Sequence, residues 1–287
     1  MTFLELLQQD VLVIDGAAGT VIQNMAFGDE HYGGADYRML TDLVTLSQPE
    51  AIKQVHRDYF TAGAGAVETN TFGASAMRLA EYDFSGLNLA RFEGLPPGVD
   101  PRALSHADLA YLMSRRGAEL ACEARAEYQA QPGYDGRPLF VIGALGPSNR
   151  VLSSTRADLA TSTFDAIMDN FGDQARGLIE GGADVLLFET QQDALELKAA
   201  ILGAKRTMRE AGVALPIMAQ VTVDQFSRMQ IFHTDIHAAL VTLQDIGIDV
   251  FGINCSIGPD LMEKTIETLS RFSPLPISVV PNAGLPV

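Results

Sequence analysis

The sequence has little of what covalent frameworks and many ligand sites require. It contains two cysteines, Cys122 and Cys255, far apart in the chain, which excludes the disulfide framework of a small secreted protein. A reducing compartment is then the default, and we expect a cytoplasmic location. Tryptophan is absent, which disfavours a sugar-binding site because such sites usually stack sugar rings on aromatic side chains.

Basic residues are also scarce, with 20 Lys and Arg against 36 Asp and Glu and a formal net charge of −16. Nucleic acids and anionic membranes attract basic surfaces, so we expect neither as a partner. No stretch reaches the roughly 18 uninterrupted apolar residues of a membrane helix. The N-terminal "MTFLELLQQD" lacks a basic segment before its apolar residues, so it predicts a short amphipathic helix rather than a signal peptide.

What the sequence has is a repeated unit: a short apolar run, a glycine-rich or polar tip, and a helical stretch. Near-continuous apolar runs predict strands buried on both faces of a parallel sheet, and their alternation with helices predicts an α/β fold. The runs are 11–19, 64–75, 139–148, 183–193, 216–224, 249–258 and 276–284. Seven such strands favour a (β/α)8 TIM-type barrel. A doubly wound nucleotide-binding sheet is disfavoured because "DGAAGT" (15–20) lacks the G-x-G-x-x-G spacing.

Two other segments and the end of the chain complete this organisation. Residues 47–63 predict a helix with Ser47 as N-cap and Gly63 at its end. Residues 81–109 depart from the repeat and are either a meandering surface loop or a lid over a substrate. Because the sequence ends directly after the seventh run, we expect one barrel domain over 1–287 that is C-terminally incomplete, with seven of eight strands present.

Polar side chains follow the predicted strands, at the end where barrel enzymes build their active sites. They are Asp15, Glu68, Asn70, Thr71, Ser148, Asn149, Glu189, Gln191, Asp224, Asn254, Cys255 and Asn282. Carboxylates at several strand ends suit a glycoside hydrolase, although the lack of tryptophan counts against it.

A zinc site on Cys255 is the other chemistry that these residues allow, but it needs at least three protein ligands. His233 and His237, spaced i, i+4, are candidate partners, and the same segment also predicts the start of an ordinary helix. Cys122 lies in the helical pattern "RRGAELACEARAEY" and is interpreted as a small residue on a packing face.

Six motifs occur in order along nearly the whole chain: "IDGAAGTVIQ", "ETNTFGAS", "GALGPSNR", "FETQQD", "GINCSIGPD" and "PNAGLP". Over about 10–287 the chain resembles the homocysteine-binding domain of the homocysteine S-methyltransferase family. The last motif, together with "GALGPSNR", is most similar to the N-terminal module of the cobalamin-dependent methionine synthases. The resemblance implies a (β/α)8 barrel that transfers a methyl group to the thiol of L-homocysteine, giving methionine, with Zn2+ as cofactor.

The resemblance also implies roles for single residues. Cys255 matches the first of three zinc cysteines, and the other two are expected beyond residue 287, on the eighth strand. Asn282 matches a residue that approaches the metal when substrate is absent. Asp15 and Glu189 match positions near the amino group and the thiol of homocysteine, which makes Glu189 the candidate catalytic residue.

The same resemblance implies that Asn70 and Asn254 line the pocket. Ala17 stands where the family more usually has glycine, which leaves open the backbone shape near the substrate carboxylate.

The resemblance implies methylcobalamin as methyl donor, carried by another domain or chain, with cobalamin-binding and folate-binding modules as partners. Without the two further cysteines, we expect the chain alone to bind zinc poorly, to be inactive and to self-associate. Two alternatives stay open: a catalytically inactive homocysteine-binding remnant, and a barrel glycoside hydrolase that uses strand-end carboxylates.

Overall fold

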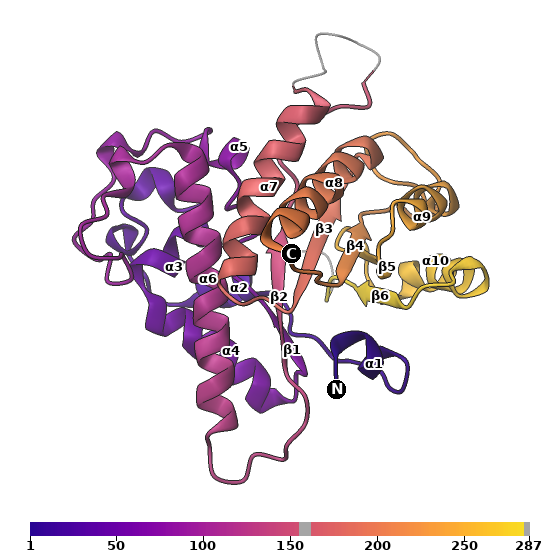
Figure 1. Cartoon of the computed structure of the whole chain (residues 1–287), viewed down its shortest axis with the longest axis horizontal. Coiled ribbons are helices and arrows are strands. Elements are labelled where there is room, and N and C mark those ends of the chain that lie inside the picture. Colours follow the sequence, from indigo (N-terminus) through magenta and orange to yellow (C-terminus); the bar gives the residue numbers. More distant parts are fainter. Residues whose placement is uncertain (155–161, 284–287) are drawn as a thin grey trace. The chain divides into compact units, whose positions relative to one another are not determined.

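The computed structural model describes residues 1–154 and 162–283, in which helices and strands alternate as predicted (Figure 1). The end of the "PNAGLP" motif lies outside the described residues. The strands are β1 (Ala66–Glu68), β2 (Phe140–Leu145), β3 (Val185–Gln191), β4 (Ile217–Val221), β5 (Val250–Asn254) and β6 (Ile277–Val280). The α-helices are α1 (Phe3–Leu7), α2 (Ala18–Asn24), α3 (Val44–Ser47), α4 (Pro49–Ala62), α5 (Ala76–Leu79), α6 (His106–Gln129), α7 (Phe164–Glu180), α8 (Ala194–Ala211), α9 (Ile236–Asp245) and α10 (Pro259–Phe272). Short 3-10 turns are η1 (Asp29–His31), η2 (Ala35–Tyr37), η3 (Thr41–Leu43), η4 (Phe84–Gly86) and η5 (Pro101–Ala103).

The strands follow the order β1-β2-β3-β4-β5-β6 in one sheet. The pairs β1–β2, β4–β5 and β5–β6 are parallel, with Val67 opposite Val141 and Phe251 opposite Ile277. Strands β2, β4 and β5 are buried along their whole length, which explains their apolar sequences. The α/β class and the parallel sheet are therefore confirmed, and among the described residues no helix is long and apolar enough to cross a membrane.

The first apolar run differs from the prediction, so the described residues hold six strands and not seven. Ile14 makes a single parallel bridge to Ala66, and the N–H of Gly65 donates to the carbonyl of Val13 at 2.8 Å. Val11 and Val13 are 84% and 63% exposed. The segment has β1 on one side only within the described chain, and it turns into α2 directly after residue 17, so its ladder stops at one bridge.

Two compact units make up the chain, and each is described by itself. Unit 1 comprises residues 1–145 and 173–186, and in it α3, α4 and α5 pack on the long helix α6. The segment 81–109 is part of this packing, because Phe84, Leu87 and Phe92 are buried in the same cluster as Leu43 and Leu109. The buried side chains show that this segment packs on unit 1, and its role as a lid over a substrate stays a prediction.

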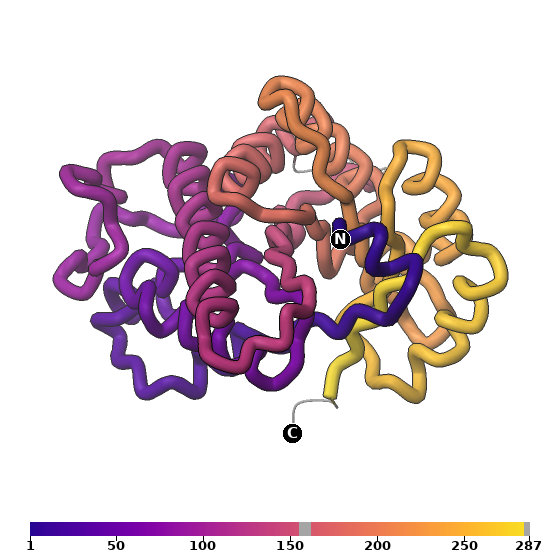
Figure 2. The backbone as a smooth tube through the Cα atoms, turned by 60° about the horizontal axis from the view of Figure 1, so that its bottom comes forward, coloured from indigo at the N-terminus to yellow at the C-terminus, as the bar shows by residue number. Residues whose placement is uncertain are grey.

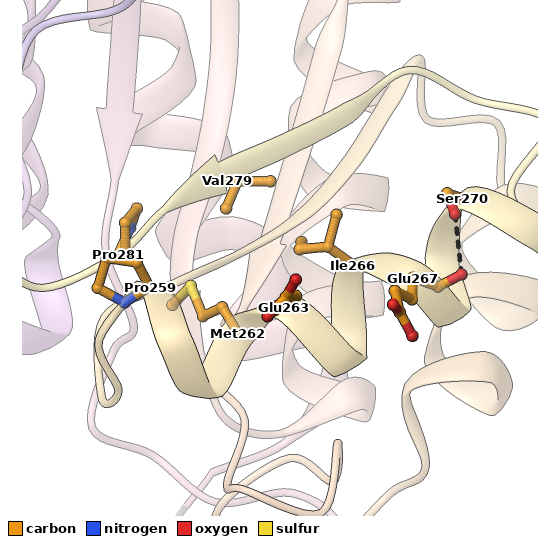
Figure 3. A pocket seen from close by; sticks show the side chains of 8 residues that line it. All are labelled: Pro259, Met262, Glu263, Ile266, Glu267, Ser270, Val279 and Pro281. Atoms are coloured by element: carbon orange, nitrogen blue, oxygen red, sulfur yellow. Dashed lines mark hydrogen bonds between the residues drawn. The ribbon is translucent and has the colours of Figure 1, made fainter.

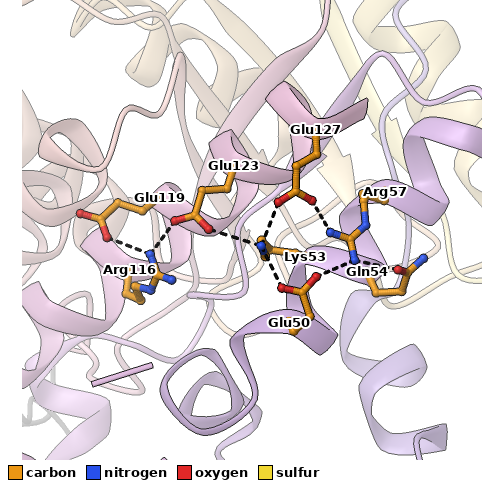
Figure 4. A network of polar contacts seen from close by, with 8 residues as sticks. All are labelled: Glu50, Lys53, Gln54, Arg57, Arg116, Glu119, Glu123 and Glu127. Atoms are coloured by element: carbon orange, nitrogen blue, oxygen red, sulfur yellow. Dashed lines mark hydrogen bonds and ion pairs between the residues drawn. The ribbon is translucent and has the colours of Figure 1, made fainter. Parts of the chain in front are cut away.

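Helix α4 shows how unit 1 is held together. It ends at Gly63, whose φ of 111° suits glycine, as predicted. Ser47 is not its N-cap, because residues 44–47 form the separate helix α3 and Gln48 precedes α4. Lys53 bonds Glu50 at 2.8 Å and Glu127 at 2.9 Å, within a network of acidic and basic residues that joins α4 to α6 (Figure 4).

Unit 2 comprises residues 146–172 and 187–287 and contains β4, β5 and β6 with α8, α9 and α10. Its last elements are traced in orange to yellow in Figure 2. Gly252 of β5 lies so close to β6 that a Cβ atom there would be 2.0 Å from the carbonyl oxygen of Ser278. The outer strand β6 is only partly buried, whereas β5 is fully buried. The close approach of these two strands fixes the position of the residues that follow β5.

Candidate functional site

Four residues of unit 2 form a connected group, here called the Cys255 cluster: Glu189, Thr190, Asn254 and Cys255. The first two lie near the end of β3, Asn254 is the last residue of β5, and Cys255 follows it. Asn254 is 2% exposed, and its side-chain oxygen accepts a hydrogen bond from the N–H of Thr190 at 2.9 Å. Its amide nitrogen lies 2.9 Å from Thr190 Oγ1, 3.4 Å from Glu189 Oε2 and 3.4 Å from Cys255 Sγ. Asn254 is thus the centre of the cluster.

The backbone turns sharply at both strand ends of the cluster. Thr190, Cys255 and Ser256 have φ values of 58°, 59° and 67°, a region that residues other than glycine rarely adopt. The N–H of Cys255 donates to the carbonyl of Val280 at 3.0 Å, and the N–H of Asn282 donates to the carbonyl of Ile257 at 3.2 Å. These bonds tie the loops after β5 and β6 together, and a role of the Asn282 side chain stays a prediction.

Unit 1 contributes two carboxylates at neighbouring strand ends. Asp15 is 7% exposed, and its Oδ2 accepts a hydrogen bond from the N–H of Glu68 at 3.0 Å. Burial raises the pKa of Glu68 to about 7. Burial and the negative charges of Asp15 and Glu68 raise the pKa of the nearby Tyr59 hydroxyl. The pair would therefore favour a positively charged ligand group, since a cation would relieve the repulsion between two carboxylates.

Asn70, predicted to line the pocket, is bonded to the protein itself. It is 9% exposed, and its amide donates to the carbonyl of Thr41 at 3.0 Å and to Thr45 Oγ1 at 3.1 Å. It thereby fastens the loop after β1 to the segment that leads into α3. Its contact with substrate remains a prediction.

The structure adds a residue that sequence reasoning missed. Asp42 is 5% exposed and accepts a hydrogen bond from the N–H of Gly73 at 2.7 Å. Burial raises its pKa to about 6. A Cβ atom at Gly73 would lie 2.8 Å from the carboxylate, so glycine allows this close approach. Asp42 holds the loop after β1, and the only sequence signal for it was the glycine in "ETNTFGAS".

Other predicted strand-end residues have structural partners. The N–H and hydroxyl of Ser148 both donate to Glu196 Oε1, at 2.8 and 2.5 Å, and burial raises the pKa of Glu196 to about 6. Asp224 accepts hydrogen bonds from the N–H groups of Phe226 and Arg228, which shapes the hairpin after β4. Ser148 and Asp224 therefore fix loops around the strand ends.

The described residues contain no group of three His, Cys, Asp or Glu side chains that could hold a metal ion. The described residues do not support the candidate two-histidine site, because His233 lies in a turn before α9 with its side chain 66% exposed, while the His237 ring packs against Phe272 with centroids 4.8 Å apart. The environment of Cys255 does fit one zinc ligand, since amide and hydroxyl groups beside a sulfur stabilise a thiolate. Cys122 packs in α6 with its sulfur 3.2 Å from the carbonyl oxygen of Gly182, as expected of a packing residue.

The sequence of this chain matches a known protein family over most of its length. The family model for homocysteine S-methyltransferase matches residues 12–287. The chain belongs to the homocysteine S-methyltransferase family. This confirms the resemblance carried by the six motifs, and it favours a methyltransferase over the glycoside hydrolase alternative.

Two mycobacterial methionine synthases are among the relatives of this chain. That of Mycobacterium tuberculosis is 35% identical over 284 residues, which are 99% of this chain and 21% of the relative. That of Mycobacterium leprae is 34% identical, with the same coverage. This member of the homocysteine S-methyltransferase family therefore spans about a fifth of the length of these relatives.

Solved structures agree with the fold. The metallated form of the homocysteine methyltransferase MmuM from Escherichia coli has a TM-score of 0.72 and 24% identity, covering 96% of this chain and 85% of that one. The oxidised form has a TM-score of 0.73 and 22% identity, covering 97% and 85%. This likeness establishes a shared α/β fold.

An open apolar groove lies between α10 and the outer strand β6 of this family member (Figure 3). Its lining residues are Pro259, Met262, Glu263, Ile266, Glu267, Ser270, Val279 and Pro281. None of them is a predicted site residue, and Glu263 and Glu267 are its only ionisable lining residues. The Cys255 cluster in unit 2 and the Asp15–Glu68 pair in unit 1 are therefore the candidate functional groups, and their sharing one cavity stays a prediction.

Proposed function

We propose that this chain is the homocysteine-binding module of a methionine synthase, which prepares the thiol of L-homocysteine for methyl transfer. The observation that carries the proposal is the Cys255 cluster, where a buried amide bonds both a carboxylate, Glu189, and a potential metal-binding thiol, Cys255. Membership of the homocysteine S-methyltransferase family and the methionine synthase relatives support it. The sheet would form most of a (β/α)8 barrel, with residues 1–287 in one domain.

The two ends of homocysteine need different chemistry. Asp15 and Glu189 would bind the ammonium group through charge-assisted hydrogen bonds, which orient the substrate without taking its proton. Asn254 would line the pocket and keep the Glu189 carboxylate in place, while Asn70 would hold the loop after β1. Glu189 also lies on the thiol side in this arrangement, which makes it the candidate catalytic residue.

The thiol must lose its proton before it can attack a methyl group. A free thiol has a pKa near 8.5, so only a small fraction is thiolate at neutral pH. Cys255 would hold Zn2+, with Asn282 as a further candidate and two further cysteines expected beyond residue 287. Zinc, when bound, would supply the positive charge that keeps the substrate sulfur deprotonated and nucleophilic.

The methyl donor in this proposal is methylcobalamin, held by a module outside this chain, with a folate-binding module as a second partner. The length of the methionine synthase relatives leaves room for such modules, since this chain matches only 21% of them. Donor and partners rest on the similarity of the motifs to the cobalamin-dependent branch.

Isothermal titration of the chain with L-homocysteine tests the proposal. Asp15→Asn and Glu189→Gln should each weaken binding about tenfold or more, since a charged hydrogen bond contributes about 1.5–3 kcal/mol. Asp58→Asn and Glu210→Gln, exposed carboxylates of units 1 and 2, are matched controls that should bind normally. Equal affinity of all five proteins, or no binding by any of them, would refute the assignment.

A further inference from the structure

The Thr190 hydroxyl occupies a defined place between two other groups. Its Oγ1 accepts a hydrogen bond from the amide nitrogen of Asn254 at 2.9 Å, so its own hydrogen is available for the sulfur of Cys255, 3.7 Å away. A hydroxyl has one hydrogen to give and two lone pairs to accept with. Thr190 can therefore donate to the sulfur while it accepts from Asn254.

The backbone holds this hydroxyl where it is. The N–H of Thr190 donates to Asn254 Oδ1 at 2.9 Å, so the two residues are joined by two hydrogen bonds. Thr190 also has a φ of 58°, an uncommon value for a β-branched residue, and such a conformation persists only where surrounding contacts enforce it. The bonds to Asn254 supply such contacts, which keep the hydroxyl directed at Cys255.

We propose that Thr190 is a positioning residue for the Cys255 sulfur, and that Asn254 links this sulfur to the Glu189 carboxylate. This rests on the proposed function, in which Cys255 binds the metal and Glu189 the substrate. The Asn254 amide lies 3.4 Å from each of them and so holds both groups at one point. In this proposal, these contacts fix the orientation of the Cys255 sulfur toward the metal before the substrate binds.

Alkylation of the chain's two cysteines tests the proposal without metal or substrate. The protein is treated with excess iodoacetamide at pH 8, and mass spectrometry follows the peptides that contain Cys255 and Cys122. The rate at Cys122, which lies in unit 1, serves as the internal reference. Thiolate is the reactive form, so loss of a donor to the sulfur should slow Cys255 relative to Cys122.

Thr190→Val is the decisive variant, because valine keeps the β-branched shape and removes only the hydroxyl. We expect the Cys255/Cys122 rate ratio to fall about twofold to tenfold, which corresponds to one hydrogen bond. Thr190→Ser, which restores a hydroxyl, should return the ratio toward that of the wild type. Thr222→Val is the matched control: Thr222 is 2% exposed beside the end of β4, and its hydroxyl has no hydrogen-bond partner, so the ratio should not change.

Asn254→Asp keeps the acceptor for the Thr190 N–H and removes the amide donors, so it should lower the ratio at least as much. This variant also serves if Thr190→Val does not fold, as judged by circular dichroism. An unchanged ratio in the folded variants, or a loss that serine does not rescue, would overturn the proposal. Homocysteine titration of the wild type would be unaffected by that result, so the two failures are distinguishable.

Discussion

Replacing Asp42 with asparagine should change how the stability of the chain depends on pH. Asp42 is buried in unit 1 with its carboxylate on the Gly73 N–H, and burial raises its pKa from 3.8 to about 6. Well below the unfolded pKa of 3.8 the carboxyl is protonated in both the folded and the unfolded chain, so it does not affect stability there. As pH rises to about 6 the unfolded chain ionises first, and the folded state loses stability until the folded pKa is passed.

The size of this loss follows from the pKa difference. About 2 units at roughly 1.4 kcal/mol each give about 3 kcal/mol in total. Between pH 5 and pH 8, a range above the sequence pI of about 4.6, the remaining part is roughly 1.4 kcal/mol. Asparagine keeps an oxygen for the Gly73 N–H and does not ionise. Asp42→Asn should therefore gain about 1.4 kcal/mol over the wild type on going from pH 5 to pH 8.

Urea unfolding of both proteins at pH 5 and pH 8 measures how the stability difference between the variant and the wild type changes with pH. An effect of the substitution on packing is equal at the two pH values and therefore cancels. Asp58→Asn, an exposed carboxylate on α4, is the control and should show no such gain. If Asp42→Asn gains nothing between pH 5 and pH 8, or loses stability, the carboxyl is ionised at low cost. The account of the loop after β1 would then be wrong.

Two further variants probe unit 1. His56 is 1% exposed, neither ring nitrogen has a hydrogen-bond partner among the described residues, and burial lowers its pKa to about 4. The folded state should thus lose stability as pH falls from about 6.5 toward 4, and His56→Leu should gain about 2 kcal/mol over the wild type on going from pH 8 to pH 5 in urea unfolding. If His56→Leu instead lost stability relative to the wild type on going from pH 8 to pH 5, the imidazole would be charged inside the folded protein. Lys53→Met removes the cation shared by Glu50 and Glu127 and should cost about 1 kcal/mol in thermal unfolding at low salt, with a smaller cost in 1 M NaCl. A cost that salt does not reduce would assign the effect to packing.

The sequence was most informative where burial dictates composition. Each of the last six apolar runs contains an observed strand, because strands covered on both faces must be apolar along their length. The first run is also apolar but forms a single bridge, because within the described chain it has β1 on one side only. The local sequence does not encode how many strands flank a segment. Ser47 failed as an N-cap for a similar reason, since the preceding residues form α3.

The candidate site was predicted in part. Asn254 and Glu189 stood out because polar residues at the ends of apolar strands are conspicuous, and the structure brings both to the Cys255 cluster. Thr190 was missed because threonine is common in strands, and nothing in "FETQQD" marks its positive φ. Asp42 was missed because "LTDLV" resembles an ordinary helical turn, and its burial depends on long-range packing against Gly73.

A crystal structure of the chain with L-selenohomocysteine tests the central claim most directly, because the anomalous signal of selenium locates the substrate chalcogen independently of the protein density. The account predicts the amino group within about 2.7–3.2 Å of both the Asp15 and the Glu189 carboxylates. It also predicts that the selenium atom lies at the end of the bound ligand that faces the Cys255 sulfur. Selenium bound away from Cys255, or an amino group bound by neither carboxylate, would contradict the account.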